Sequence, residues 1–251
     1  MFLPFIYNFI SMSNSWFAFK QFKINQDKTA MKVGTDGVLL GAWVDVVNVE
    51  TALDIGTGTG LIALMMAQRN SRLKVDAIDI EESACEQAEE NFDSSPWSER
   101  LTVKYQSLKQ YVDETGCKYD VIVCNPPYFT NGVKAGDEKR RIARHADELT
   151  LDELFEQSNR LLNDFGRLNL VYPHAGYESL VFTAGKYGLF PEVVVHVRPI
   201  AGKDFVRVLI SLSKSDAGNF KESELTIETD RRHFYTVEFK RLVEDFYLNV
   251  K

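Results

Sequence analysis

The amino-acid sequence predicts an α/β fold: a doubly wound, mostly parallel seven-stranded sheet with an antiparallel hairpin at its edge and a short N-terminal extension. Apolar strand-like runs alternate with helical patterns between residues 51 and 187, which is typical of a parallel sheet covered by helices. A glycine-rich turn follows the first of these runs. Two β-rich runs, 191–197 and 204–212, follow each other with no helix between them, which predicts the hairpin.

The individual elements follow from the local pattern of side chains. Residues 19–26 alternate apolar and polar side chains, which predicts a strand, and Thr35 and Asp36 are suited to cap a helix that continues through Trp43. Further strands are expected at 51–55, 74–80, 101–105, 119–125 and 167–172, and further helices at 61–69, 83–92, 151–163, 175–187 and about 236–247. Two segments lack such a pattern. The polar, basic stretch 129–149 is long enough to be a functional loop, and 213–223 is weakly structured.

Composition places the chain among ordinary soluble proteins with a large core. Of its 251 residues, 45% are hydrophobic and 26% are charged. A net charge of −7 disfavours a broad, non-specific nucleic-acid binder, but allows one local basic surface. The three cysteines are an odd number without a C-x-x-C pair. They argue against a disulfide framework or a zinc site, and for the reducing cytoplasm.

The N-terminus carries no targeting signal that we recognise. Residues 1–11 are apolar, but they lack a basic region and a cleavage site, and they are much shorter than the ~20 residues of a membrane span. We treat 1–11 as an appendage, because Met1 and Met12 could each be the translation start. Residues 12–50 are expected to pack as an extension on the main domain, 51–251. We expect no membrane association.

The segment 54–60, DIGTGTG, is the first candidate binding site. Its glycines allow a sharp turn and close approach of the backbone to a ligand. The spacing is G-x-G-x-G, since Leu61 stands where the dinucleotide fingerprint needs glycine, and this favours a ligand without a pyrophosphate, such as S-adenosylmethionine. Asp79 ends the second strand, where a carboxylate can accept both ribose hydroxyl protons. The alternative is a tight turn that needs glycine for structural reasons alone.

The segment Asn125-Pro126-Pro127-Tyr128 follows the fourth strand and is the candidate chemical site. The doubly wound order places it beside the glycine turn. An exocyclic amine is a poor nucleophile because its lone pair is delocalised. The Asn125 side-chain oxygen and the Pro126 carbonyl could hold its hydrogens out of the planar geometry, and Tyr128 could stack on the base. The alternative is a rigid turn that only ends a strand.

A basic cluster lies in the predicted loop, a few residues after this turn. It contains Lys134, Lys139, Arg140, Arg141 and Arg144, against only two acids. Such a cluster could hold the phosphates of a nucleic acid, or it could be a solvated charged loop. We interpret the neighbouring His145 as structural, because transfer from a sulfonium needs no strong base.

These motifs carry a resemblance to known families. DIGTGTG, IDI and NPPYF together resemble the amino-methylating branch of the Rossmann-like methyltransferases. The resemblance to the bacterial valine-tRNA adenine-N6 methyltransferase family is closer and runs from about Trp16 to Lys251. Its segments are FKQFKINQDKTAMKVGTDGVLLGAW (19–43), SPW (95–97), NPPYF (125–129), ARH (143–145) and YTVEFKRLVEDFYL (235–248).

The resemblance implies a Rossmann-like methyltransferase fold and methylation of the N6 amine of an adenine in tRNA, namely adenine 37 of valine tRNA. S-adenosyl-L-methionine would be the donor and S-adenosyl-L-homocysteine the product, in a cytoplasmic monomer without a metal. The implied catalytic residues are Asn125, Pro126, Pro127 and Tyr128; the donor-binding residues are Asp54, Gly56, Thr57, Gly58, Gly60, Asp79, Lys32 and Thr35; and the substrate-binding residues are Phe129, Lys139, Arg140, Arg141 and Arg144.

Three alternative functions stay open at this point. A glutamine N5-methyltransferase of a protein release factor would use the same N-P-P-Y turn, because an amide nitrogen poses the same chemical problem. A different RNA or DNA amino-methyltransferase is the second alternative. A non-enzymatic RNA-binding module is the third, although such a module needs neither the acid-flanked glycine turn nor Asn125.

Overall fold

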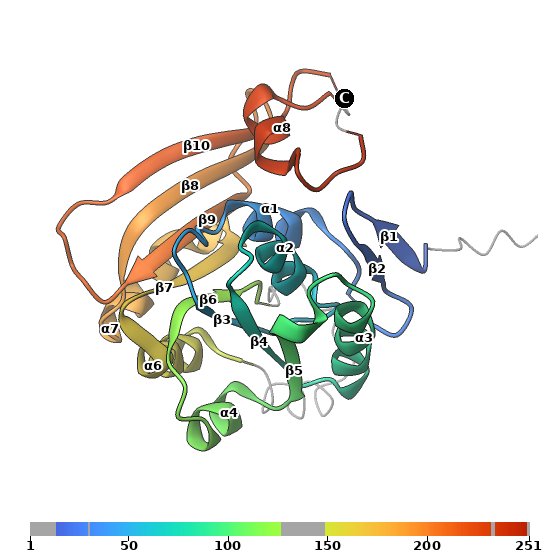
Figure 1. The fold of residues 1–251 in the computed structure, drawn as a ribbon. Coiled ribbons are helices and arrows are strands. Elements are labelled where there is room, and N and C mark those ends of the chain that lie inside the picture. The colour runs from blue at the N-terminus through green and yellow to red at the C-terminus, as the bar shows by residue number, and fades with distance from the viewer. Residues whose placement is uncertain (1–13, 30, 127–148, 232–233, 250–251) are drawn as a thin grey trace, which may run out of the picture.

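The computed structural model describes residues 14–29, 31–126, 149–231 and 234–249. Its centre is an eight-stranded sheet in the order β10-β8-β9-β7-β6-β3-β4-β5 (Figure 1). The strands are β3 Thr51–Ile55, β4 Lys74–Asp79, β5 Leu101–Tyr105, β6 Tyr119–Cys124, β7 Leu162–Pro173, β8 Phe190–Ile200, β9 Arg207–Ser213 and β10 Lys221–Glu228. Only β9 runs antiparallel to its neighbours. The chain order reverses between β3 and β6, so the predicted doubly wound α/β fold is confirmed.

Helices cover both faces of this sheet (Figure 1). One face carries α1 Thr35–Trp43, α2 Leu61–Arg69, α3 Glu82–Asp93 and α8 Val237–Val243. The other face carries α4 Leu108–Glu114, α6 Leu151–Leu161 and α7 Tyr177–Lys186. The short 3-10 turns are η1 Ser98–Arg100 and η2 His174–Gly176. Successive strand residues point to opposite faces. In β3, Ala52 therefore joins the core under α1 and α2, whereas Leu53 joins the core under α4 and α6. Among the described helices, none is long and apolar enough to cross a membrane.

The sheet has one strand more than the seven predicted. Residues 221–228 form β10, which pairs in parallel with β8 and places the β8–β9 hairpin one strand in from the edge. The sequence KESELTIE shows no clear alternation of apolar and polar residues that would predict this strand, and only Leu225 in it is buried. An edge strand with mostly polar side chains is a common way to avoid pairing with other chains, and it leaves little apolar pattern to recognise.

The N-terminal prediction was wrong in detail. Within the predicted strand 19–26, only 23–25 form a strand, which pairs with residues 16–18 in a small antiparallel hairpin, and Phe19 and Phe22 lie at its turn. Its strands are β1 Trp16–Ala18 and β2 Lys23–Asn25. The expected cap on the next helix is also absent, since Gly34 occupies the N-cap position without a side-chain hydrogen bond.

Helix α4 was not predicted, although the sequence contains a signal for it. Ser107 and Gln110 form a capping box, in which each side chain accepts a hydrogen bond from the backbone of the other. The pattern S-x-x-Q before an apolar residue is typical of such a helix start. This helix matters for the site because it begins directly after β5, at the carboxyl edge of the sheet.

Buried amides hold the N-terminal segment against the glycine turn. The Asn91 side chain accepts a hydrogen bond from the Asn25 amide at 2.8 Å, and it donates to the carbonyl oxygens of Asn25 and Thr59 at 2.9 and 2.8 Å. The neighbouring Gln87 accepts from the Lys28 amide at 3.0 Å. Because Thr59 belongs to the glycine turn, α3 connects the N-terminal segment directly to the candidate binding site.

The close crossing of α1 and α2 yields a test of this packing. A Cβ atom on Gly41 would lie 2.8 Å from Sδ and 3.0 Å from Cβ of Met65. Because a Cβ moves only with its backbone, we expect Gly41→Ala to destabilise the protein by about 1–3 kcal/mol. Thermal unfolding followed by circular dichroism measures this as a lower Tm.

A matched control lies on the exposed side of α7. A Cβ on Gly185 meets nothing within 4 Å, and alanine is favoured over glycine in a helix by roughly 0.5–1 kcal/mol. Gly185→Ala should therefore keep or raise the Tm. A Gly41→Ala variant as stable as the wild type would show that the two helices do not cross in this way.

Candidate active site

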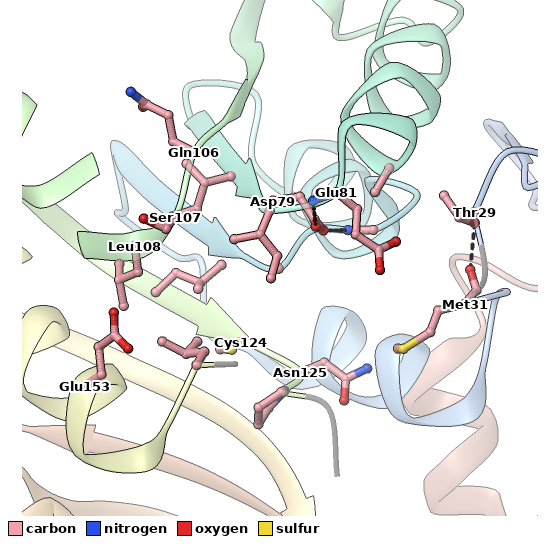
Figure 2. A pocket seen from close by; sticks show the side chains of 18 residues that line it. Thr29, Met31, Asp79, Glu81, Gln106, Ser107, Leu108, Cys124, Asn125 and Glu153 are labelled. Atoms are coloured by element: carbon pink, nitrogen blue, oxygen red, sulfur yellow. Dashed lines mark hydrogen bonds between the residues drawn. The ribbon is translucent and has the colours of Figure 1, made fainter. Parts of the chain in front are cut away.

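Two adjoining cavities lie where the carboxyl ends of β3, β4 and β6 meet. The first has a volume of about 230 Å³ and extends past Asp79 toward α4 and α6; the second, of about 380 Å³, lies toward α1 and β9. Asn125 and Pro126 line both cavities, and Figure 2 shows Asn125 at the edge of the first one. Open α/β sheets bind ligands in such crevices, where the strand order reverses.

The glycine turn forms the boundary between β3 and α2. Gly56, Gly58 and Gly60 all have positive φ angles, of 70°, 56° and 79°, which glycine adopts without strain. A Cβ on Gly56 or Gly58 would meet nothing within 4 Å, and both residues line both cavities. A Cβ on Gly60 would lie 2.5 Å from Cε1 of Phe92. The first two glycines therefore leave room for a ligand, whereas the third leaves room for α3.

Asp79 lies at the end of β4 and lines the first cavity. Its Oδ2 accepts a hydrogen bond from the Gly58 amide at 2.8 Å, and its Oδ1 accepts one from the Glu81 amide at 3.0 Å. A carboxylate has about four acceptor positions. Two of them remain for donors in the cavity, which suits a pair of neighbouring hydroxyl groups.

Asp54 lies beneath the glycine turn and is fully buried. Its Oδ2 accepts a hydrogen bond from the Thr57 hydroxyl at 2.8 Å. Burial raises the pKa of Asp54 to about 7, and the negative charge of Asp79 adds to this, against the opposing effect of hydrogen bonds from Thr57 and the Ala63 backbone. Asp54, which was predicted to bind the donor, thus stabilises the glycine turn through its hydrogen bond with Thr57.

The far end of the first cavity lies between α4 and α6. Leu108 forms an apolar wall there, and Glu153 of α6 lines the same end (Figure 2). Ile80, which follows Asp79 in the chain, is a further apolar residue of the lining. Sequence reasoning did not find Glu153, because a T-x-x-E pattern at a helix start indicates a cap. Only the packing of α6 beside α4 brings this side chain to the cavity.

The second cavity contains residues from the N-terminal segment. Lys32 and Thr35, which were predicted to bind the donor, line this cavity. Asp36 accepts a hydrogen bond at 2.9 Å from Nε of Arg207, the first residue of β9, in an ion pair across the cavity wall. No local sequence pattern indicates this pair, since its members are 171 positions apart.

Several predicted site residues lie outside the described ranges. They are Pro127, Tyr128, Phe129, Lys134, Lys139, Arg140, Arg141, Arg144 and His145. Within the part of the chain that the structure covers, no group of three His, Cys, Asp or Glu side chains could hold a metal ion. Burial raises the pKa of the Cys124 thiol, and burial with nearby acids raises that of Cys85 to about 11, so both thiols stay protonated at neutral pH.

Comparison with known sequences identifies relatives over most of the chain. The family model described as methyltransferase small domain matches residues 33–188. Proteins from three bacteria that are described as tRNA1(Val) (adenine(37)-N6)-methyltransferase are similar to this chain. The Parabacteroides distasonis protein is 47% identical over 95% of this chain and 100% of its own, the Flavobacterium psychrophilum protein 45% over 93% and 100%, and the Yersinia pestis protein 41% over 93% and 94%.

Solved structures share the fold at low sequence identity. A predicted O-methyltransferase from Agrobacterium tumefaciens superposes with a TM-score of 0.67 at 17% identity, over 84% of this chain and 96% of its own. A ribosomal protein L11 methylase from Lactobacillus delbrueckii superposes with a TM-score of 0.50 at 18% identity, over 72% and 77%. These likenesses support the Rossmann-like methyltransferase architecture.

The raised pKa of Asp54 predicts a pH dependence of stability without ligand. The folded protein holds this proton more tightly than the unfolded chain, so the stabilisation is present at low pH and is lost as the pH rises through about 7. The loss amounts to about 4 kcal/mol at most. Asp54→Asn does not titrate, so the Tm of the wild type relative to this variant should fall between about pH 5 and 7 and level off above that.

Asp120 provides the control at the opposite edge of the sheet. Burial, which would raise its pKa, is outweighed by hydrogen bonds from Glu50, Asn163 and Thr51, so the pKa is lowered. The Tm difference between the wild type and Asp120→Asn should therefore stay constant over the same pH range. An equally constant difference for Asp54→Asn would contradict the burial of the Asp54 carboxyl group under the turn.

Proposed function

The chain belongs to the methyltransferase small domain family and to the tRNA1(Val) (adenine(37)-N6)-methyltransferases, and we propose that it methylates the N6 amine of adenine 37 in valine tRNA. The resemblance noted in the sequence is confirmed, and the chain is an S-adenosylmethionine-dependent enzyme. Valine tRNA and the position of the adenine come from the names of the relatives, so they are the parts of this proposal that need direct measurement.

One observation carries the proposal: Asn125 and Pro126 line both cavities at once. A transferase must bring a donor and an acceptor to the same point from separate binding sites. Here the donor would occupy the first cavity, and the target base would enter the second. Lys32 and Thr35, which the resemblance implies as donor-binding residues, line the second cavity, so in this arrangement they would face the base. The N-P-P-Y turn would then stand between them, at the point of transfer.

The residues of the first cavity fit S-adenosylmethionine. Gly56 and Gly58 leave open space beside the backbone, where the amino-acid part would lie. Asp79 keeps two acceptor positions for the ribose hydroxyls, and Ile80 and Leu108 offer apolar surfaces for the adenine ring. When bound, the donor supplies a methyl group that is activated by the positive sulfonium.

Asn125 and Pro126 would prepare the acceptor amine. The Asn125 side-chain oxygen and the Pro126 carbonyl oxygen would each accept a hydrogen bond from the amine, so that the nitrogen lone pair leaves conjugation with the ring. The same two oxygens would stabilise the positive charge that develops on nitrogen. Tyr128 would stack on the target base, and Pro127 would keep the turn stiff.

The tRNA would be held by the basic segment that follows the turn. Phe129, Lys139, Arg140, Arg141 and Arg144 are the proposed contacts, with the cations binding phosphates. Because one chain lines both cavities, we propose that the enzyme acts as a monomer. A tRNA substrate also implies action in the cytoplasm.

The alternatives are less well supported. The three relatives compared above, at 41–47% identity over almost the whole chain, are all described as tRNA enzymes, which disfavours a glutamine methyltransferase. Incubation with labelled donor and either valine tRNA or a release factor distinguishes the two. Mass spectrometry of the tRNA nucleosides then identifies the methylated atom, and label on the release factor alone would overturn the proposal.

The role of Asn125 can be tested by removing its side-chain oxygen. In Asn125→Ala, the amine keeps its unreactive planar geometry, so single-turnover methylation of tRNA should slow by ~10²–10³-fold, the usual effect of losing one preorganised hydrogen-bonding group. Donor affinity, measured by calorimetry, should change little.

Asn163→Ala is a matched control, because that amide hydrogen-bonds Asp120 at 2.7 Å at the amino end of the sheet. This variant should methylate tRNA at the wild-type rate. A wild-type rate in Asn125→Ala would mean that the turn is only a scaffold.

The basic segment can be tested through its dependence on salt. Replacing Arg140 and Arg141 with alanine should weaken tRNA binding and flatten its salt dependence by about two phosphate contacts. Donor affinity should stay unchanged. The control replaces Arg72 and Lys74, which are exposed at the amino end of the sheet, and it should leave the salt slope as it was. Equal slopes in both double variants would show that the segment is merely solvated.

A further inference from the structure

The base of the methyl donor would lie at the far end of the first cavity, so the side chains there would select between different bases. Asp79 fixes the position of the ribose in the proposed function, on which this inference rests. The adenine ring would then extend toward Ile80 and Leu108, the apolar walls beyond Asp79. Apolar walls hold any flat ring, so they do not distinguish adenine from other purines. Selection between bases requires a polar group at the outer edge of the ring.

Each of the two polar side chains that follow β5 donates a hydrogen bond to a side chain of α4. The Gln106 amide nitrogen donates to Glu114 at 2.6 Å. The Ser107 hydroxyl donates to Gln110 and accepts from its backbone amide, which forms the cap of α4. The chain therefore has no acid at this place. The Gln106 side-chain oxygen is buried without a partner among the described residues, but it is an uncharged acceptor, and hydrogen bonds to a carboxylate are roughly twice as strong.

Glu153 is the polar side chain on the other wall of the same end. It lies at the third position of α6, after the cap residue Thr150, whose hydroxyl oxygen accepts a hydrogen bond from the Glu153 amide at 3.1 Å. A glutamate at this position commonly turns back to the cap residue. Here no side-chain bond of Glu153 to another described residue exists, and the carboxylate lines the cavity beside Leu108 (Figure 2).

The chemistry of a carboxylate suits one edge of adenine. An ionised carboxylate only accepts hydrogen bonds, and the 6-amino group of adenine donates them. A purine with an oxygen at this position would face the carboxylate with an acceptor, so it would be repelled. We propose that Glu153 selects the adenine base of the methyl donor by accepting a hydrogen bond from its 6-amino group.

Calorimetry with two product analogues tests this without using activity. S-adenosylhomocysteine carries the 6-amino group, and S-inosylhomocysteine carries an oxygen instead. The wild type should prefer the first by at least 10-fold. Glu153→Ala should lose about 10- to 100-fold in affinity for S-adenosylhomocysteine, the range for a hydrogen bond to a charged group. Glu153→Gln should reduce the preference most, because its amide can accept from the amine or donate to the oxygen.

Glu156→Gln is the matched control, since Glu156 is exposed on the same helix, and it should keep the wild-type preference. A preference that is unchanged in Glu153→Gln, with S-adenosylhomocysteine still bound, overturns the role of Glu153 and leaves the proposed function intact. A wild type that binds neither analogue overturns both. A purely structural role of Glu153 would change the affinities for the two analogues equally, which also contradicts the proposal.

Discussion

The two backbone amides bound by the Asp79 carboxylate determine the shape of the candidate active site. One belongs to Gly58, in the turn after β3, and the other to Glu81, before α3. The carboxylate thus joins two neighbouring strand-to-helix turns and holds the left-handed backbone of the glycine turn in place. Parallel strands make this possible, because their carboxyl ends meet at one edge of the sheet. The cavities on either side of the turn exist only while it keeps this form.

The N-terminal segment depends on the same turn, although it is distant in the sequence. Asn91 binds Asn25 on one side and the carbonyl oxygen of Thr59 on the other. A buried amide with every hydrogen-bonding group paired is costly to displace, because its partners would be left unsatisfied. The segment that lines the second cavity is therefore held by α3, and the ion pair between Asp36 and Arg207 joins it to β9. The second cavity is assembled from three distant parts of the chain.

The sequence predicted those parts of the fold that local patterns determine. Helix α2, Leu61–Arg69, has the predicted bounds, because its apolar side chains and the preceding glycines both mark it. Strand β10 was not predicted, because its side chains are mostly polar and its position is set by pairing with β8, a strand that is not its neighbour in the sequence. The same division holds for the site. Asp79 and Asn125 stand next to recognisable turns, whereas Glu153 and Arg207 reach the cavities through packing, which no local pattern encodes.

The acidic residues of the site differ in how many hydrogen-bond acceptor positions remain open to a ligand, and this difference separates their functions. Asp54 is buried and holds the Thr57 hydroxyl, so it acts on the turn. Asp79 holds two amides and has acceptor positions left. The Glu153 carboxylate makes no hydrogen bond to another described residue, so its acceptor positions stay open to the cavity. Asp79, Glu81 and Glu153 line one cavity, so in the proposed reaction they attract the cationic donor. Transfer removes the sulfonium charge, and the Coulomb attraction to these carboxylates falls with it. An acidic cavity therefore favours exchange of product for fresh donor.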